Sequence, residues 1–124
     1  MIFYKKDIQQ LPKPTEVVIN YGSGRLTIDS NGGYIAGIEI HYQGDINYNF
    51  LKILTDNTIC ETANNKIVIV NLTDKIIQGE IMHYKGYFKI DKVIISDRDA
   101  KQVGASLNFQ NAKWKPENMY IEPE

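Results

Sequence analysis

Short runs in which hydrophobic and polar residues alternate follow one another along most of this chain. In the run at 34–43, every second side chain from Ile38 to Tyr42 is apolar, and the side chains between them are polar. Alternate residues lie on the same face of a β-strand, so this spacing predicts strands with one face in a core and one in solvent. Segments 22–24 and 31–33, each with two glycines, separate the runs as turns.

The pattern extends over most of the chain. It predicts strands at residues 15–21, 25–29, 34–43, 58–61, 66–71, 80–86, 87–90, 91–96 and 105–109. The first two form a hairpin. Residues 66–71 are apolar on both faces, which predicts a central strand. Residues 46–54 fit either a strand or a loop, because their apolar residues also suit a helical turn.

These elements predict an all-β protein: an antiparallel β-sandwich, immunoglobulin-like or jelly-roll-like, of roughly seven to nine strands. A chain of 124 residues holds one such domain, since a second would have no room for a core. We place the sandwich at 15–110, between an N-terminal arm at 1–14 and a C-terminal arm at 111–124. The residues predicted to contribute to the core are Val17, Ile19, Leu26, Ile28, Ile38, Ile40, Ile67, Ile69, Val93 and Ile95.

Both arms depart from the alternating pattern. The segments 12–14 and 115–116 contain prolines, which lack the N–H group needed inside a sheet. Aromatic side chains in such extended arms are not needed by the core, and exposed groups of that size usually find a partner. The arms either wrap over the ends of their own domain or dock on a neighbouring subunit. The residues predicted to bind a partner are Phe3, Tyr4, Trp114 and Tyr120.

Composition narrows the classes of function. The net charge is -1 and no stripe of basic residues is present, so we expect neither nucleic acid nor an anionic membrane as a partner. Cys60 is the only cysteine, which excludes an internal disulfide. The sequence shows no signal-peptide layout and no apolar run of membrane-spanning length, so we expect a protein made in the cytoplasm. The glycosylation acceptor pattern at 71–73 is interpreted as a turn.

Both histidines belong to an echo within the chain, in which residues 38–44 resemble residues 80–86 around a shared His-Tyr-x-Gly. The pattern predicts two sandwich strands whose histidines, His41 and His83, face outward. They would share a metal site only if the strands were adjacent and a carboxylate such as Glu39 or Glu80 joined them. The close histidine spacing of known metalloenzyme motifs is missing, so we expect no metal.

Other sequence motifs for ligand binding or catalysis are incomplete or missing. Asp97-Arg98-Asp99 resembles the start of a calcium loop, but the glycine and closing glutamate of such a loop do not follow. We interpret it as a solvated turn with an internal Asp–Arg contact. Neither a nucleotide-binding glycine pattern nor a nucleophile elbow occurs, so we expect no cofactor and no enzymatic activity.

From Gly33 to Val103, the order of elements resembles the cohesin-like, immunoglobulin-type β-sandwiches of bacterial adhesion and carbohydrate-handling proteins. Residues 35–42 are similar to their early strand, residues 65–69 to a middle strand, and residues 89–99 to a late strand followed by an acidic turn. The resemblance consists of strand patterning and implies the fold first. As a function, it implies a carbohydrate-binding or cohesin-like adhesion module. A carbohydrate-binding module would expose an aromatic platform on one sheet, and the candidates for it in this sequence are Tyr34, Tyr48 and Tyr87.

A small sandwich with aromatic arms also resembles, as a class, the small structural proteins of bacteriophage particles. On this basis we predict a non-enzymatic structural or adaptor subunit that mediates protein–protein assembly as a component of a bacteriophage virion. The expected partners are proteins, in a homo-oligomer or a larger assembly. The adhesion or carbohydrate-binding module is the alternative.

Overall fold

Ten β-strands build the protein in the computed structural model, which describes residues 10–51, 54 and 58–109. Their bounds are β1 Val17–Gly22, β2 Arg25–Asp29, β3 Gly37–Gln43, β4 Ile46–Phe50, β5 Thr58–Ala63, β6 Lys66–Asn71, β7 Gly79–Gly86, β8 Lys89–Ser96, β9 Gln102–Val103 and β10 Ala105–Phe109. Within these residues, no helix is long and apolar enough to cross a membrane.

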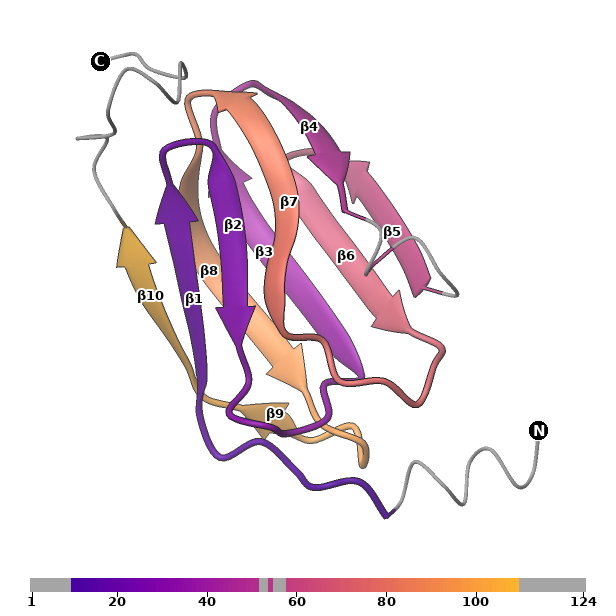
Figure 1. Cartoon of the computed structure of the whole chain (residues 1–124). Coiled ribbons are helices and arrows are strands. Elements are labelled where there is room, and N and C mark those ends of the chain that lie inside the picture. Colours follow the sequence, from indigo (N-terminus) through magenta and orange to yellow (C-terminus); the bar gives the residue numbers. More distant parts are fainter. Residues whose placement is uncertain (1–9, 52–53, 55–57, 110–124) are drawn as a thin grey trace.

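The strands form two sheets that pack face to face as a β-sandwich (Figure 1). Sheet A has the order β10-β1-β2-β7-β4, and sheet B has the order β5-β6-β3-β8-β9. Neighbouring strands are antiparallel, except that β1 and β10 run parallel. The predicted all-β sandwich and the hairpin of the first two strands are therefore confirmed.

The core lies between the sheets and follows the alternation of the sequence. In β1, Val17 and Ile19 are fully buried, and the residue between them is partly exposed. Burying a side chain of this size contributes about 1.5–3 kcal/mol. All ten residues predicted for the core lie in it, Val93 as a partly buried member.

Several boundaries differ from the prediction. Residues 87–90 and 91–96 were predicted as separate strands, but 89–96 forms the single strand β8. Residues 46–50 of the ambiguous segment form β4. The two-residue strand β9 was not predicted, because two residues are too few to show an alternation. Together with β4, it brings the number of strands above the expected range.

The described part of the N-terminal arm lies against the sandwich. The backbone N–H of Tyr34 donates to the carbonyl of Pro12 at 2.8 Å. A Cβ atom at Gly33 would lie 2.3 Å from Pro14 Cα, so only glycine allows this close passage of the two backbones. The contact fixes the segment before β1 across the start of the loop that leads into β3.

The two echo strands end side by side, although β3 belongs to sheet B and β7 to sheet A. Their final glycines, Gly44 and Gly86, have φ angles of 122° and 110°. A Cβ atom at Gly44 would lie 1.8 Å from the carbonyl oxygen of Tyr87, and one at Gly86 would lie 2.5 Å from that of Asp45. The repeated glycines therefore let the β3–β4 and β7–β8 turns pack against each other.

Asn71 organises the connection that leaves β6. Its side chain is buried; Nδ2 donates to the carbonyls of Ile35 and Lys75, both at 3.0 Å. Its Oδ1 accepts the N–H of Thr73 at 3.0 Å and the hydroxyl of the same residue at 2.7 Å. The glycosylation acceptor pattern thus forms a bend, as predicted, and its amide is occupied by the fold.

Candidate protein-binding surface

A β-bulge gathers one histidine cluster on the outer face of sheet A. Ile81 is the extra residue of β7 at this point, because Leu26 pairs with Met82 and the next residue of β2 pairs with Glu80. The bulge turns Glu80 and His83 to the same face, which residues three apart in a regular strand would not share. His83 Nε2 lies 3.0 Å from Glu80 Oε1.

The other histidine cluster lies on the outer face of sheet B. His41 Nε2 lies 2.6 Å from Glu39 Oε2, and Lys66 Nζ lies 3.7 Å from the same oxygen. The hydrogen bond with His41, helped by the charge of Lys66, holds the pKa of Glu39 below its usual value. Because the two histidines lie on opposite outer faces of the sandwich, the shared metal site considered above does not form. The described residues include no group of three or more possible metal ligands.

The acidic turn after β8 uses its first carboxylate to bind backbone rather than a cation. Asp97 is buried, and its Oδ1 accepts the N–H groups of Asp99 at 2.8 Å and Lys101 at 3.0 Å. The prediction of a solvated turn is therefore wrong for Asp97. A short carboxylate side chain commonly closes a turn in this way, by replacing a backbone acceptor.

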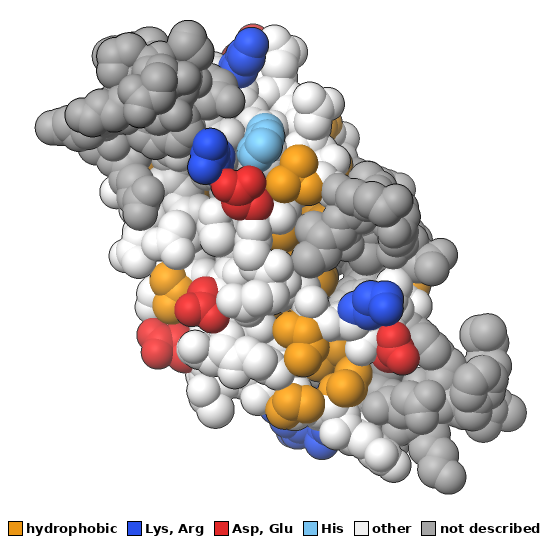
Figure 2. All heavy atoms as spheres, viewed as in Figure 1, with side chains coloured by type: hydrophobic (Ala, Val, Ile, Leu, Met, Phe, Trp, Pro, Cys, Tyr) orange, Lys and Arg blue, Asp and Glu red, His pale blue; other side chains and the backbone are white. Residues whose placement is uncertain are grey.

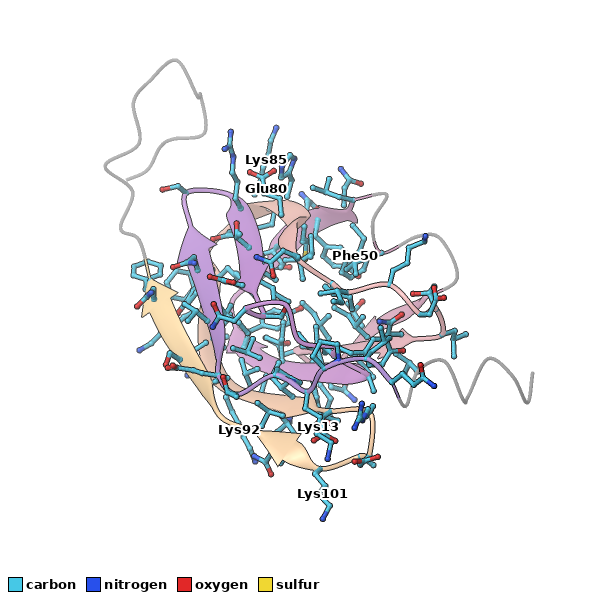
Figure 3. All side chains as sticks on the ribbon, turned by 60° about the horizontal axis from the view of Figure 1, so that its bottom comes forward. Lys13, Phe50, Glu80, Lys85, Lys92 and Lys101 are labelled. Atoms are coloured by element: carbon cyan, nitrogen blue, oxygen red, sulfur yellow. The ribbon has the colours of Figure 1, made fainter. Side chains whose placement is uncertain are left out.

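The N-terminal segment supplies the other contacts of this turn. Arg98 donates to the carbonyl of Leu11, and Lys13 Nζ lies 2.6 Å from Asp99 Oδ2, which lowers the pKa of Asp99. Figure 3 shows Lys13 beside the turn and Lys101 pointing away from the sandwich. The charge of Arg98 also lowers the pKa of Asp99, so an Asp–Arg interaction exists within the turn as predicted. The hydrogen bond of Arg98 and the ion pair of Asp99 are made with residues 11–13, which the local sequence could not reveal.

The three tyrosines considered for a carbohydrate platform do not come together. Tyr34 is 1% exposed, and its hydroxyl donates to the carbonyl of Thr73 at 2.6 Å. Tyr48 is partly buried, and its hydroxyl is hydrogen-bonded to that of Thr62. Tyr87 alone of the three is largely exposed, at 63%. A flat sugar-binding platform needs aromatic faces open to solvent, so these residues do not form one.

The exposed apolar side chains of the described residues indicate candidate binding surfaces apart from the terminal arms. The aromatic residues predicted to bind a partner lie outside those residues, so their role stays a prediction: Phe3, Tyr4, Trp114 and Tyr120. The large apolar side chains that the structure exposes are Val70, Leu72, Tyr87, Leu107 and Phe109. Two of these belong to the edge strand β10, and Val70 belongs to a strand inside sheet B.

The outer face of sheet B carries apolar side chains on both sides of β3. In the pairing register, Glu39 stands between Val68 of β6 and Ile94 of β8. In the next row, Gly37 stands beside Val70, which is 37% exposed. Val68 and Ile94 are half-buried, and no described element covers this face.

A row of basic residues borders these apolar positions. His41 pairs with Lys66 on one side and with Lys92 on the other. All three side chains share the outer face with Glu39, since residues two apart on a strand point the same way. We call the surface formed by Val68, Val70, Ile94, Lys66 and Lys92 around Glu39 and His41 the sheet B face.

The outer face of sheet A has a different composition. Figure 2 shows mainly polar and charged side chains and backbone over β1 and β2. In the register of β10, β1 and β2, Asn108 pairs with Asn20, which pairs with Thr27. Arg25 and Glu80 form an ion pair at 3.2 Å on this side. The pattern is that expected of a solvated face of an antiparallel sheet.

Sequence reasoning missed the sheet B face, although its signal was present. The apolar residues on both faces of 66–71 predict a central strand. The strand is central, lying between β5 and β3, but described elements cover only one of its faces. The surplus apolar residues at Val68, Val70 and Ile94 are thus outward-facing.

No family model and no curated protein sequence matches this chain. Solved structures with a similar arrangement include a type I cohesin–dockerin complex from Clostridium thermocellum, at 12% identity over 82% of this chain and 97% of that one, with a TM-score of 0.45. A non-cellulosomal cohesin from the archaeon Archaeoglobus fulgidus gives 14% identity over 89% and 99%, with a TM-score of 0.48. These structures are similar to the chain in the arrangement of their strands, which is the kind of likeness that the sequence pattern led us to expect. Nothing in these comparisons supports the predicted bacteriophage role.

Proposed function

We propose that this protein is a protein-binding module of the adhesion or adaptor type and that it binds its partner on the sheet B face. The observation that carries the proposal is the clustering of Val68, Val70 and Ile94 on one outer face, where Val70 is exposed and the other two are half-buried. The opposite face is mainly polar over β1 and β2. Outward positions of an antiparallel sheet are normally polar, so clustered apolar side chains there indicate a surface that is covered in use.

The backbone under this face suits a rigid recognition surface. Strands β6, β3 and β8 are each hydrogen-bonded on both sides, in the order β5-β6-β3-β8-β9. The face is therefore preorganised, and little conformational entropy is lost when a partner binds. Such a surface favours a partner that presents a flat or helical apolar patch over one that must fill a deep pocket.

The charges on the face indicate the chemistry of the partner. Glu39 is already paired with His41 and Lys66, and Lys92 stands beside His41 in the pairing register. Among the described residues, the row therefore presents Lys92 as a cation that Glu39 does not pair, with Asp91 hydrogen-bonded to Gln43 next to it. A suitable partner would have apolar side chains next to an acidic group. Its apolar side chains would be buried against Val68, and its acidic group would pair with the lysines.

Val70→Lys and Ile94→Lys test the proposal, because both place a charge among the apolar side chains without changing the buried face of either strand. A binder would first be selected from a displayed library of protein fragments of the native source, with a dockerin domain included as a defined probe. We expect each substitution to weaken binding at least about tenfold, as loss of a central apolar contact usually does.

Thr27→Lys is the matched control, since it adds the same charge at a partly exposed position of sheet A. It should leave the affinity unchanged. Binding that survives both sheet B substitutions but is lost in Thr27→Lys would refute the assignment of the face. Failure to select any protein ligand would refute the function itself.

A further inference from the structure

Strand β10 leaves one edge of sheet A open. Within the described residues it pairs with β1 alone, in a parallel register that places Leu107 beside Ile19. The N–H of Val17 donates to the carbonyl of Gly104 at 3.2 Å. In a parallel ladder, the backbone N–H and C=O groups of every second residue point to the same side. The N–H and C=O of Ser106 therefore face β1, and those of Leu107 face away from it.

The side chains of this edge are unusually apolar for an exposed strand. Leu107 is 38% exposed and Phe109 is 59% exposed, although their partners Ile19 and Tyr21 are buried in the core. The strand Ala105–Phe109 contains no charged residue and no proline. Exposed edges are normally protected from pairing by such residues, and β10 has neither.

The shape of sheet B explains why these side chains are uncovered. Strand β9 pairs only with Ile95 and Ser96 of β8, so it lies beside the beginning of β10 and not beside its end (Figure 1). The other edge of sheet A is closed differently, because Tyr48 of β4 packs against the core and its hydroxyl bonds that of Thr62 on β5. As far as the structure describes the chain, the open side of the sandwich is therefore the side of β10.

We propose that β10 pairs antiparallel with β10 of a second copy of this chain, about a two-fold axis at Leu107. The axis would place Leu107 opposite its own copy and Ala105 opposite Phe109 of the other chain. These are the residues whose N–H and C=O groups face away from β1, so each opposed pair would exchange two hydrogen bonds. The two copies of sheet A would become one continuous sheet.

A second copy fits this edge for reasons of size and charge. Opposing Ala105 to Phe109 sets a small side chain against a large one, and no like charges meet because the strand is uncharged. The axis reverses the strand direction, so the beginning of β10 in one copy would lie beside the end of β10 in the other. Strand β9 of each copy would therefore cover the end of β10 that the other copy leaves uncovered. The joint is smaller than a standard protein interface, so the dimer should dissociate on dilution.

The first test measures mass by light scattering over a wide concentration range for the intact chain. We expect the mass to rise towards that of two copies. Leu107→Pro removes an outward N–H without touching the ladder to β1, and Leu107→Lys keeps the backbone but adds an edge charge; both should shift dissociation at least tenfold higher in concentration. Thr27→Lys and Val70→Lys, away from the edge, should not.

The second test is amide hydrogen exchange followed by NMR on the unmodified chain. The N–H groups of Leu107 and Phe109 should gain protection as the concentration rises, whereas that of Ser106 should be protected throughout. A monomer at every concentration would overturn the proposal, as would a dimer that persists in both Leu107 variants. Protection of Leu107 that does not depend on concentration would show that the chain covers its own edge, and it would overturn the proposal too.

Discussion

Truncation of Asn71 to alanine should destabilise the sandwich more than any other single asparagine substitution among the described residues. The change removes both donors to the carbonyls of Ile35 and Lys75 and the acceptor used twice by Thr73. These bonds join the end of β6, the segment that enters β3 and the bend that follows. The expected result is a loss of stability without a change of fold.

The magnitude follows from the number and burial of these bonds. A hydrogen bond contributes about 1 kcal/mol net, and a buried partner left unpaired costs about 1–3 kcal/mol. The carbonyl at Ile35 is the buried one, whereas the groups near Lys75 regain water. We therefore expect Asn71→Ala to lower the free energy of unfolding by about 3 kcal/mol. For a chain of this length that is a fall in Tm of about 12 °C.

Urea unfolding monitored by circular dichroism and by tryptophan or tyrosine fluorescence measures this difference, and scanning calorimetry gives Tm. Asn49→Ala is the matched control, because Asn49 is an exposed residue of β4 and its truncation should change stability by less than about 0.5 kcal/mol. Equal stability of the two variants would refute the role given to Asn71. A difference confined to the slope of the transition would mean that the unfolded state had changed instead.

Three further outcomes are expected. Gly44→Ala should destabilise the protein strongly or prevent folding, since φ is 122° and the new Cβ would clash with the carbonyl oxygen of Tyr87. Gly32→Ala is the control and should cost about 1 kcal/mol, because φ is 82° there but no atom lies within 4 Å of the new Cβ. Equal urea midpoints of the two variants would contradict this. Burial raises the pKa of Tyr84 from 10.0 to about 12, so the stability of the fold should fall as the pH rises from 10 towards 12. In an ultraviolet titration, Tyr84→Phe should lack the tyrosine that ionises last in the original chain. Because the pKa of Glu39 is lowered in the folded protein, its ionised carboxylate stabilises the fold above about pH 4.5. This contribution is lost as the pH falls through the folded pKa, so acid should shift the urea midpoint less in Glu39→Gln than in the original chain.

The inward-facing half of the fold could be predicted from the sequence because alternation is a local signal. Ile38 and Ile40 identify their own strand face without reference to any partner. Strand pairing is not local: nothing near Val17 shows that it runs parallel to Ala105. The bulge at Ile81, which brings the histidine of β7 to the side of a glutamate three residues away, is likewise set by the partner strand.

The candidate binding surface illustrates a second limit. An apolar residue at an outward position, such as Val68 or Ile94, has the same sequence signal whether a further layer covers it or solvent meets it. The two cases differ only in the number of layers, and the part of the chain that the structure describes forms two. The terminal aromatics Phe3 and Trp114 were favoured for binding because they lie outside the strands, but the structure does not describe them.

The parallel pairing of the first and last strands has a mechanical consequence. The chain enters the sandwich at the start of β1 and leaves it at the end of β10, which lie at opposite ends of the molecule (Figure 1). Tension applied between these points slides β1 along β10, so the register pairs from Val17–Ala105 to Tyr21–Phe109 are loaded in shear and must yield together. Antiparallel terminal strands pulled from a common end would open one bond at a time. A link built this way resists force along its long axis by geometry, with no added stability at rest.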